Sequence, residues 1–400
     1  MNHAEPHFRR RTETSDGLFN IAFDPKRTSL RGYGFYGRLA KESGNWLLET
    51  AQNWRSPGFE VNDMGTLSRT DYKWMQTSAL RQWTTPGSWY RDAAVIVGGQ
   101  QSLNYEGDRI DLQGAVWGRA TFKNYMSLSG FVINHPPTYD ALRTRGGVVV
   151  KTAGYNYYSA NVSGDSRNRI SWDGGSSTGR NITDNGWNAD GYANLILKPF
   201  VNLRVSFGPS YSRSVDPKQY VTTVVDSTAP QFGNVRNVFA RLDQHSLSMN
   251  TRINATFTPN LTLELFAQPF LASGAYDEMK QYAASRTNST LNFGTEIGTL
   301  EFVRDAKGRL TDYRIDPDGG AGPSRPFDVG NPDFNIRSLR GTAVLRWEYR
   351  PGSTVFFVWT QERSGSEAYG DFDVNRDKSA LFRDRPVNVF QIKASYWLGI

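Results

Sequence analysis

The most suggestive chemical motif is glycine-rich, with the G-x-G-x-x-G spacing of a dinucleotide-binding turn at residues 32–37. Such a turn holds a pyrophosphate where it follows a buried strand and opens a helix. Residues 23–30, just upstream, are polar and include a proline. The motif therefore does not predict a nucleotide site. Its alternating aromatics predict a curved strand with Tyr33, Phe35 and Leu39 on one face.

Candidate metal ligands are sparse. The chain has no cysteine and four histidines, His3, His7, His135 and His245, with no H-E-x-x-H spacing. The run Asp316-Pro-Asp318-Gly319 begins like a calcium loop, but its twelfth position is Phe327, where a bidentate glutamate is required. A calcium loop completed by neighbouring aspartates stays as the weaker alternative to a solvated external loop. We predict no metal and no cofactor.

The sequence shows no recognisable catalytic set. It contains no phosphate-binding P-loop. Glu264 and Glu348 could serve as the two carboxylates of a glycosidase, but one sequence cannot pair them. Each is equally explained as a charge that lies beside a basic neighbour. We therefore predict that the chain is not an enzyme.

The composition favours strands and turns. Of 400 residues, 13% are aromatic and 38 are glycine, and both kinds are typical of strands joined by tight turns. The net charge is +7, yet the basic residues are scattered and only Arg9–Arg11 forms a run. This spread argues against nucleic acid as a partner. No apolar run is long enough for a transmembrane helix.

Hydrophobicity alternates with a period of two in many segments, as in residues 201–208, 247–257, 261–268, 339–349 and 390–400. One face of each segment is apolar and the other is polar or charged, which predicts strands. Short turns alternate with four long polar connections, which we place at residues 135–146, 173–186, 274–332 and 364–386. This arrangement is typical of an outer-membrane β-barrel.

A soluble sandwich would show the same alternation, so two further features decide between the classes. The segments span ten or more residues, as a tilted membrane crossing requires, whereas globular strands are shorter. Aromatic residues also gather at the segment ends, as interfacial girdles do. We predict an antiparallel transmembrane β-barrel of about 14 to 18 strands over residues 15–400. Residues 1–14 are expected to be a disordered or linker segment.

Four segments carry a family resemblance: residues 56–72, 257–276, 331–363 and 388–400. They resemble the C-terminal barrel region of the domain of unknown function 5916 family. Members of that family are exported bacterial proteins with a signal peptide, a family-9-like carbohydrate-binding module and early barrel strands ahead of this region. The resemblance implies a bacterial outer-membrane location. Because this sequence shows neither signal nor module, we expect a truncated chain and an incomplete barrel.

The expected function is a conduit or uptake component for solutes, with glycans among the candidates. The alternative is a non-transporting platform that anchors a carbohydrate-binding module. The expected partners are outer-membrane lipid, the barrel-assembly machinery and a glycan or small solute. Six residues are predicted to line the lumen: Arg204, Arg252, Glu264, Arg346, Glu348 and Lys393. Four aromatic residues are predicted to bind ligand in external loops: Tyr139, Trp172, Trp187 and Tyr369.

Overall fold

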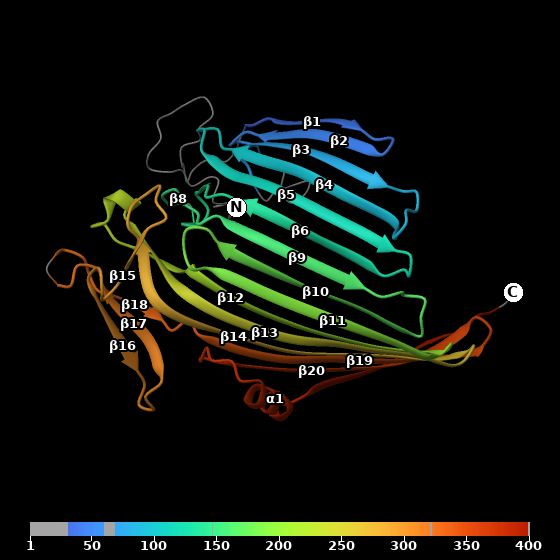
Figure 1. Cartoon of the computed structure of the whole chain (residues 1–400). Helices are drawn as coiled ribbons and strands as arrows, with labels where there is room; N and C mark the ends of the chain where they lie inside the picture. The colour runs from blue at the N-terminus through green and yellow to red at the C-terminus, as the bar shows by residue number, and fades with distance from the viewer. Residues whose placement is uncertain (1–30, 60–68, 146, 321, 399–400) are drawn as a thin grey trace.

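A single antiparallel sheet dominates the computed structural model, which describes residues 31–59, 69–145, 147–320 and 322–398. The sheet has sixteen strands (Figure 1). Fifteen form one row: β1 Gly34–Lys41, β2 Trp46–Arg55, β3 Tyr72–Trp83, β4 Tyr90–Leu103, β5 Arg109–Phe122, β6 Ser127–His135, β9 Tyr155–Ser163, β10 Ile170–Asn181, β11 Trp187–Phe200, β12 Leu203–Val225, β13 Val235–Thr258, β14 Leu261–Tyr282, β19 Phe334–Arg350, β20 Ser353–Glu367 and β21 Val387–Ser395. The sixteenth, β15 (Thr290–Asn292), pairs with the end of β14.

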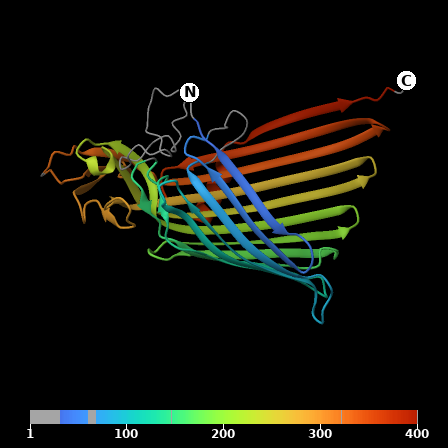
Figure 2. The ribbon, with the colours of Figure 1, turned by 90° about the horizontal axis from the view of Figure 1, so that it is seen from above.

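The row of strands is strongly curved. Figure 2 shows β21 (red) at one side of the molecule and the middle strands (green) at the other, with β1 (blue) running obliquely across the middle of the view. Within the described part of the chain no ladder joins β1 to β21, so the sheet is open. The predicted antiparallel all-β fold is confirmed, with a number of strands inside the expected range. The G-x-G-x-x-G segment forms β1 and opens no helix.

Connections at the two ends of the strands differ in length. At one end they are tight turns, such as Pro351–Gly352 between β19 and β20, where Gly352 adopts a positive φ of 75°. At the other end most are long, including residues 136–154, 283–333 and 368–386. We call these ends the short-turn rim and the long-loop rim. The predicted asymmetry between the two kinds of connection is confirmed.

The predicted loop boundaries need correction. Residues 173–181 were expected in a loop but belong to β10, because their backbone pairs with both β9 and β11. The expected loop 274–332 begins with the last part of β14 and contains further strands. The expected loop 364–386 begins with the end of β20 and contains a helix. The terminal strand ends at Ser395, and residues 396–398 lie outside it.

The long connections carry small structures of their own. Residues 136–154 contain β7 (Tyr139–Asp140) and β8 (Val150–Lys151), which pair with each other. The β14–β19 connection contains a separate sheet of β16 (Thr299–Arg304), β17 (Leu310–Asp316) and β18 (Phe327–Gly330). The β12–β13 connection has a 3-10 turn, Pro230–Phe232, and the β20–β21 connection has helix α1, Val374–Arg383. The predicted segment 1–14 lies outside the described residues.

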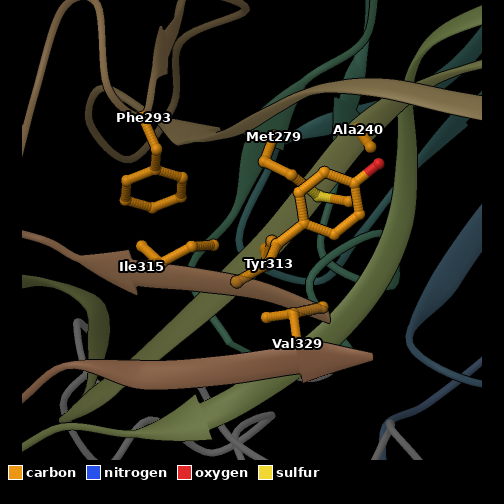
Figure 3. Close-up of a cluster of buried hydrophobic side chains, with 7 residues drawn as sticks. Ala240, Met279, Phe293, Tyr313, Ile315 and Val329 are labelled. Carbon is orange, nitrogen blue, oxygen red and sulfur yellow. The ribbon is translucent and has the colours of Figure 1, made fainter. Parts of the chain in front are cut away.

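Most buried apolar side chains gather at the long-loop rim and in its connections, and few lie along the rest of the sheet. One cluster packs β17 and β18 against the far ends of β13 and β14 through Val238, Ala240, Met279, Phe293, Tyr313, Ile315 and Val329 (Figure 3). A second joins the β7–β8 connection to the same strand ends through Val148, Val150, Ala229, Phe232, Phe239 and Tyr282. These clusters hold the long connections in place.

No α-helix in the described ranges has both the length and the hydropathy needed to cross a membrane.

Candidate functional site

One face of the sheet is apolar and exposed. Residues directly opposite each other in a ladder share a face, so the registers trace Val97, Val116, Val132 and Tyr158 onto one side of β4, β5, β6 and β9. All four side chains are between 47% and 53% exposed. The same face continues through Phe207, Met249, Trp347, Phe357, Trp359, Phe390 and Ile392, which are also exposed. We call it the apolar face.

On β12 to β14 the apolar face has a band without charge, whereas Arg81 of β3, opposite Val95, places a charge on this face near the short-turn rim. On β12 its positions from Leu203 to Tyr211 are Leu, Val, Phe, Pro and Tyr, and the next one is Arg213. On β14 the positions from Leu261 to Leu271 are likewise uncharged. Ion pairs begin only beyond this band, for example Arg213 with Asp243 at 2.8 Å. The band therefore runs from the short-turn rim part of the way up the strands.

The opposite face is polar, and all six predicted lumen residues lie on it. Their ladder partners are on the same face: Arg204 faces Asn254, Arg252 faces Ser206, Glu264 faces Asn254, Arg346 faces Thr262, Glu348 faces Thr354 and Lys393 faces Phe356. We call it the polar face. The structure thus places the six candidates on one surface, spread over strands β12 to β21.

Only some of the charges on the polar face are paired. Arg346 donates to Glu348 at 2.8 Å. The guanidinium of Arg252 lies 5.1 Å from the ring centroid of Phe266, a cation–π contact. Arg204 and Lys393 are exposed and have no ion pair among the residues described here. The free charge on this part of the face is therefore mainly positive.

Three connections, two of them long, meet across the arc of the sheet. Arg286, after β14, forms an ion pair with Asp108, in the β4–β5 connection. The backbone N–H of Arg286 also donates to the carbonyl of Val149 at 2.6 Å, and the N–H of Lys151 donates to Thr287 at 2.9 Å. Because β4 and β14 are well separated in the row, these contacts cut across the long-loop rim instead of following it.

Among the hollows at the long-loop rim, two are lined by Trp187. One, of about 800 Å³, is lined by Trp187, Lys218, Arg241, Glu278, Lys280 and Asn288 among others. The Nζ of Lys218 lies 2.9 Å from Asp184 and 2.7 Å from Asn288. Burial lowers the pKa of Lys218, although Asp184 opposes that shift. The second hollow has a volume of about 540 Å³, and Phe131, Tyr155 and Tyr157 are among the residues that line it. Both can hold a polar solute.

The four predicted ligand-binding aromatics are not brought together. Tyr139 is the first residue of β7, and its ring makes a cation–π contact with Arg286. The ring of Tyr369 makes the same kind of contact with Arg376. Trp187 is the first residue of β11 and lines both hollows. Trp172 was expected in an external loop, but it lies on the apolar face of β10 near the short-turn rim, opposite Leu195. Only Trp187 is placed to contact a ligand in the hollows.

The described residues contain no group of three or more His, Cys, Asp or Glu side chains that could hold a metal ion. Asp318, from the weak calcium-loop pattern, instead accepts the backbone N–H of Ser324 at 2.8 Å.

A family model described as "Domain of unknown function (DUF5916)" matches residues 9–400. The chain belongs to the DUF5916 family. The resemblance that residues 56–72, 257–276, 331–363 and 388–400 predicted is therefore confirmed. No curated protein matches the sequence.

Sequence reasoning missed one polar network of this DUF5916 chain. His135, the last residue of β6, lies 2.8 Å from Asp111 through Nε2, and its ring stacks on Tyr155 with a centroid distance of 4.9 Å. Gln100 donates to the other oxygen of Asp111 at 2.8 Å. Burial alone would raise the pKa of Asp111, but the hydrogen bonds from His135 and Gln100 outweigh it and keep that pKa below its usual range.

We expect the pKa of His135 to lie above its ordinary value of about 6.5, because the hydrogen bond with Asp111 outweighs burial. The contact between His135 and Asp111 then stabilises the long-loop rim fully at pH values below the ordinary pKa of histidine. This stabilisation is lost as the pH rises through the raised pKa of His135. An NMR titration of the imidazole resonance, assigned with His135→Gln, measures the value. Asp111→Asn should lower it, and an unchanged value would rule out this pairing.

Proposed function

We propose that the chain forms the wall of a barrel in the bacterial outer membrane, and that the barrel conducts or takes up small polar solutes. The observation that carries the proposal is the exposed, uncharged band on the apolar face. In water, so much contiguous exposed apolar surface marks an interaction site. In a bilayer, it meets lipid, and the polar face then lines a hydrated interior.

The height of the band supports lipid as its environment. From Leu203 to Tyr211 the strand rises about 26 Å at ~3.3 Å per residue. A strand tilted by about 40° would cover about 20 Å of bilayer, close to the apolar band of about 25 Å in outer-membrane barrels. Strands β12, β13 and β14 continue well past the band, so their far ends and the small sheet would lie outside the membrane. Insertion of such strands would require the barrel-assembly machinery.

The long-loop rim supports controlled passage. The contacts of Arg286 with Asp108 and Val149 draw three connections across the opening. The two hollows beside them combine the Trp187 indole with Lys218, Asp184 and Asn288. An aromatic plane next to amide, ammonium and carboxylate groups suits a hydroxyl-rich solute, including a glycan.

Conductance tests this proposal. The full chain inserted into planar bilayers should pass discrete currents that favour anions, because Arg204, Arg252 and Lys393 outnumber Glu264 among the free charges. The double variant Arg204→Glu, Arg252→Glu should shift the reversal potential toward cations. An inserted chain that stays silent would reject the conduit.

The second candidate function is a non-conducting platform that anchors a carbohydrate-binding module. The contacts that draw the connections across the long-loop rim favour it, since they would also block passage. Two observations separate the candidates. A platform inserts into the bilayer without passing current. It still passes no current after Arg286→Ala, which releases the β14–β19 connection from Asp108. A gated conduit should instead open more often after that substitution.

A further inference from the structure

Basic side chains gather at the short-turn rim, where the turns after β3, β5, β9 and β11 lie side by side. The guanidinium of Arg91 lies 4.1 Å from the ring centroid of Tyr125, and that of Arg167 lies 3.3 Å from it. Lys198 donates through its backbone N–H to Arg169 at 2.7 Å. We call the five cations Arg91, Lys123, Arg167, Arg169 and Lys198 the basic rim.

The basic rim has an excess of positive charge. Its neighbouring carboxylate is Asp165, and that group is held by Arg167 at 2.6 Å. The nearby Asp92 pairs with Arg119 at 3.5 Å on the polar face. The other four cations have no ion pair within the described ranges, and Arg91, Lys123 and Arg169 are exposed. Cations held this close without counter-charges attract an anion.

Exposed apolar side chains adjoin these cations. Ile170 is 61% exposed and lies on the apolar face opposite Leu197. Lys198 starts from the polar face and reaches the rim through its long side chain, whose Nζ donates to the carbonyl of Ser166 at 2.6 Å. Phe200 is 67% exposed and lies opposite Leu203 on the apolar face. Trp89 is 56% exposed, and its carbonyl accepts from Lys123 at 3.4 Å. A ligand that matches this surface carries an anionic group at the rim and extended apolar chains along the strands.

We propose that the basic rim binds the phosphodiester headgroup of an anionic glycerophospholipid, whose acyl chains lie along Ile170, Leu128 and Trp172 on the apolar face. This inference rests on the proposed membrane location and adds the class of lipid. Guanidinium and ammonium groups donate charge-assisted hydrogen bonds to phosphate oxygens. Each such cation near an anionic membrane surface contributes about fivefold in affinity. A zwitterionic phosphatidylcholine gains little of this attraction.

The test uses the full chain in phosphatidylcholine vesicles that contain spin-labelled phosphatidylglycerol or spin-labelled phosphatidylcholine. Electron paramagnetic resonance measures the motionally restricted fraction of each lipid at the protein. We expect phosphatidylglycerol to be preferred at least about fivefold, and the preference should fall as salt rises. The triple variant Arg91→Gln, Arg169→Gln, Lys198→Gln should lose it.

A matched control removes the same charge elsewhere. Lys307→Gln, Arg314→Gln, Arg325→Gln alters the β16–β18 connection, far from the short-turn rim, and should keep the preference. Flotation and protease protection in phosphatidylcholine alone report insertion separately. A chain that does not insert overturns the proposed function together with this inference. A chain that inserts but binds both lipids equally, or whose preference survives the rim variant, overturns the inference alone.

Discussion

Ala343→Arg is expected to prevent insertion of the chain into a membrane. Ala343 lies on the apolar face of β19, opposite Leu265 and Trp359 and further inside the uncharged band than Trp347 at the rim. An arginine on the lipid face of a barrel costs about 2–4 kcal/mol near the middle of the bilayer. A loss of that size is a large part of the stability of an ordinary domain. Vesicle flotation and protection from added protease measure the outcome.

The neighbouring residue provides the control. Val344 is also aliphatic, but it lies on the polar face, opposite Glu264 and Val358. Val344→Arg adds the same charge to the hydrated side and should insert normally. If both variants insert equally well, the apolar face does not meet lipid. Equal failure of both would instead point to a dry contact on each side of the sheet.

Asp384→Ala is expected to release helix α1 from the sheet. Asp384 accepts from Arg337 at 2.6 Å and 3.1 Å, and the side chain of Arg337 is 8% exposed. Removing one partner of a buried ion pair costs up to about 3 kcal/mol, and here Glu367, 3.5 Å from Arg337, keeps part of the compensation. The helix contains basic residues that trypsin cuts, so its release should appear as faster cleavage within Val374–Arg383.

The control for α1 is its exposed ion pair. Asp371 also binds a guanidinium, that of Arg376, but its side chain is 67% exposed. Exposed ion pairs contribute about 0–1 kcal/mol, so Asp371→Ala should leave the cleavage rate nearly unchanged. If Asp384→Ala behaves the same way, Leu381, which is 1% exposed, and the rest of the packing hold the helix without the buried pair.

Alternation along the chain predicted the sheet well because each strand has one polar and one apolar face. The strand at residues 247–257 and its neighbour at 261–268 were recognised in this way, and both lie in the ladders. The strand β10 was missed over residues 173–181 because its Gly- and Ser-rich sequence has few apolar side chains. Two flanking strands supply the backbone partners that local propensity does not reveal.

The candidate site was predictable only in part. The charged residues of the polar face followed from their period-two positions. The hollow around Lys218 did not, because Asp184, Lys218 and Asn288 are far apart in sequence and meet only after the connections fold. Trp172 was misplaced for the same reason as β10: a single aromatic in a polar stretch does not show whether it faces ligand or lipid.

The direction of the two outermost strands limits how the proposed barrel can close. Fifteen strands follow one another in the row, and every neighbouring pair is antiparallel, so β1 and β21 point the same way. If these two strands met, the seam would be the one parallel ladder in the structure. Any purely antiparallel closure needs an odd number of strands between them. Cysteine pairs placed along β1 and β21 would distinguish a direct seam from an interposed one.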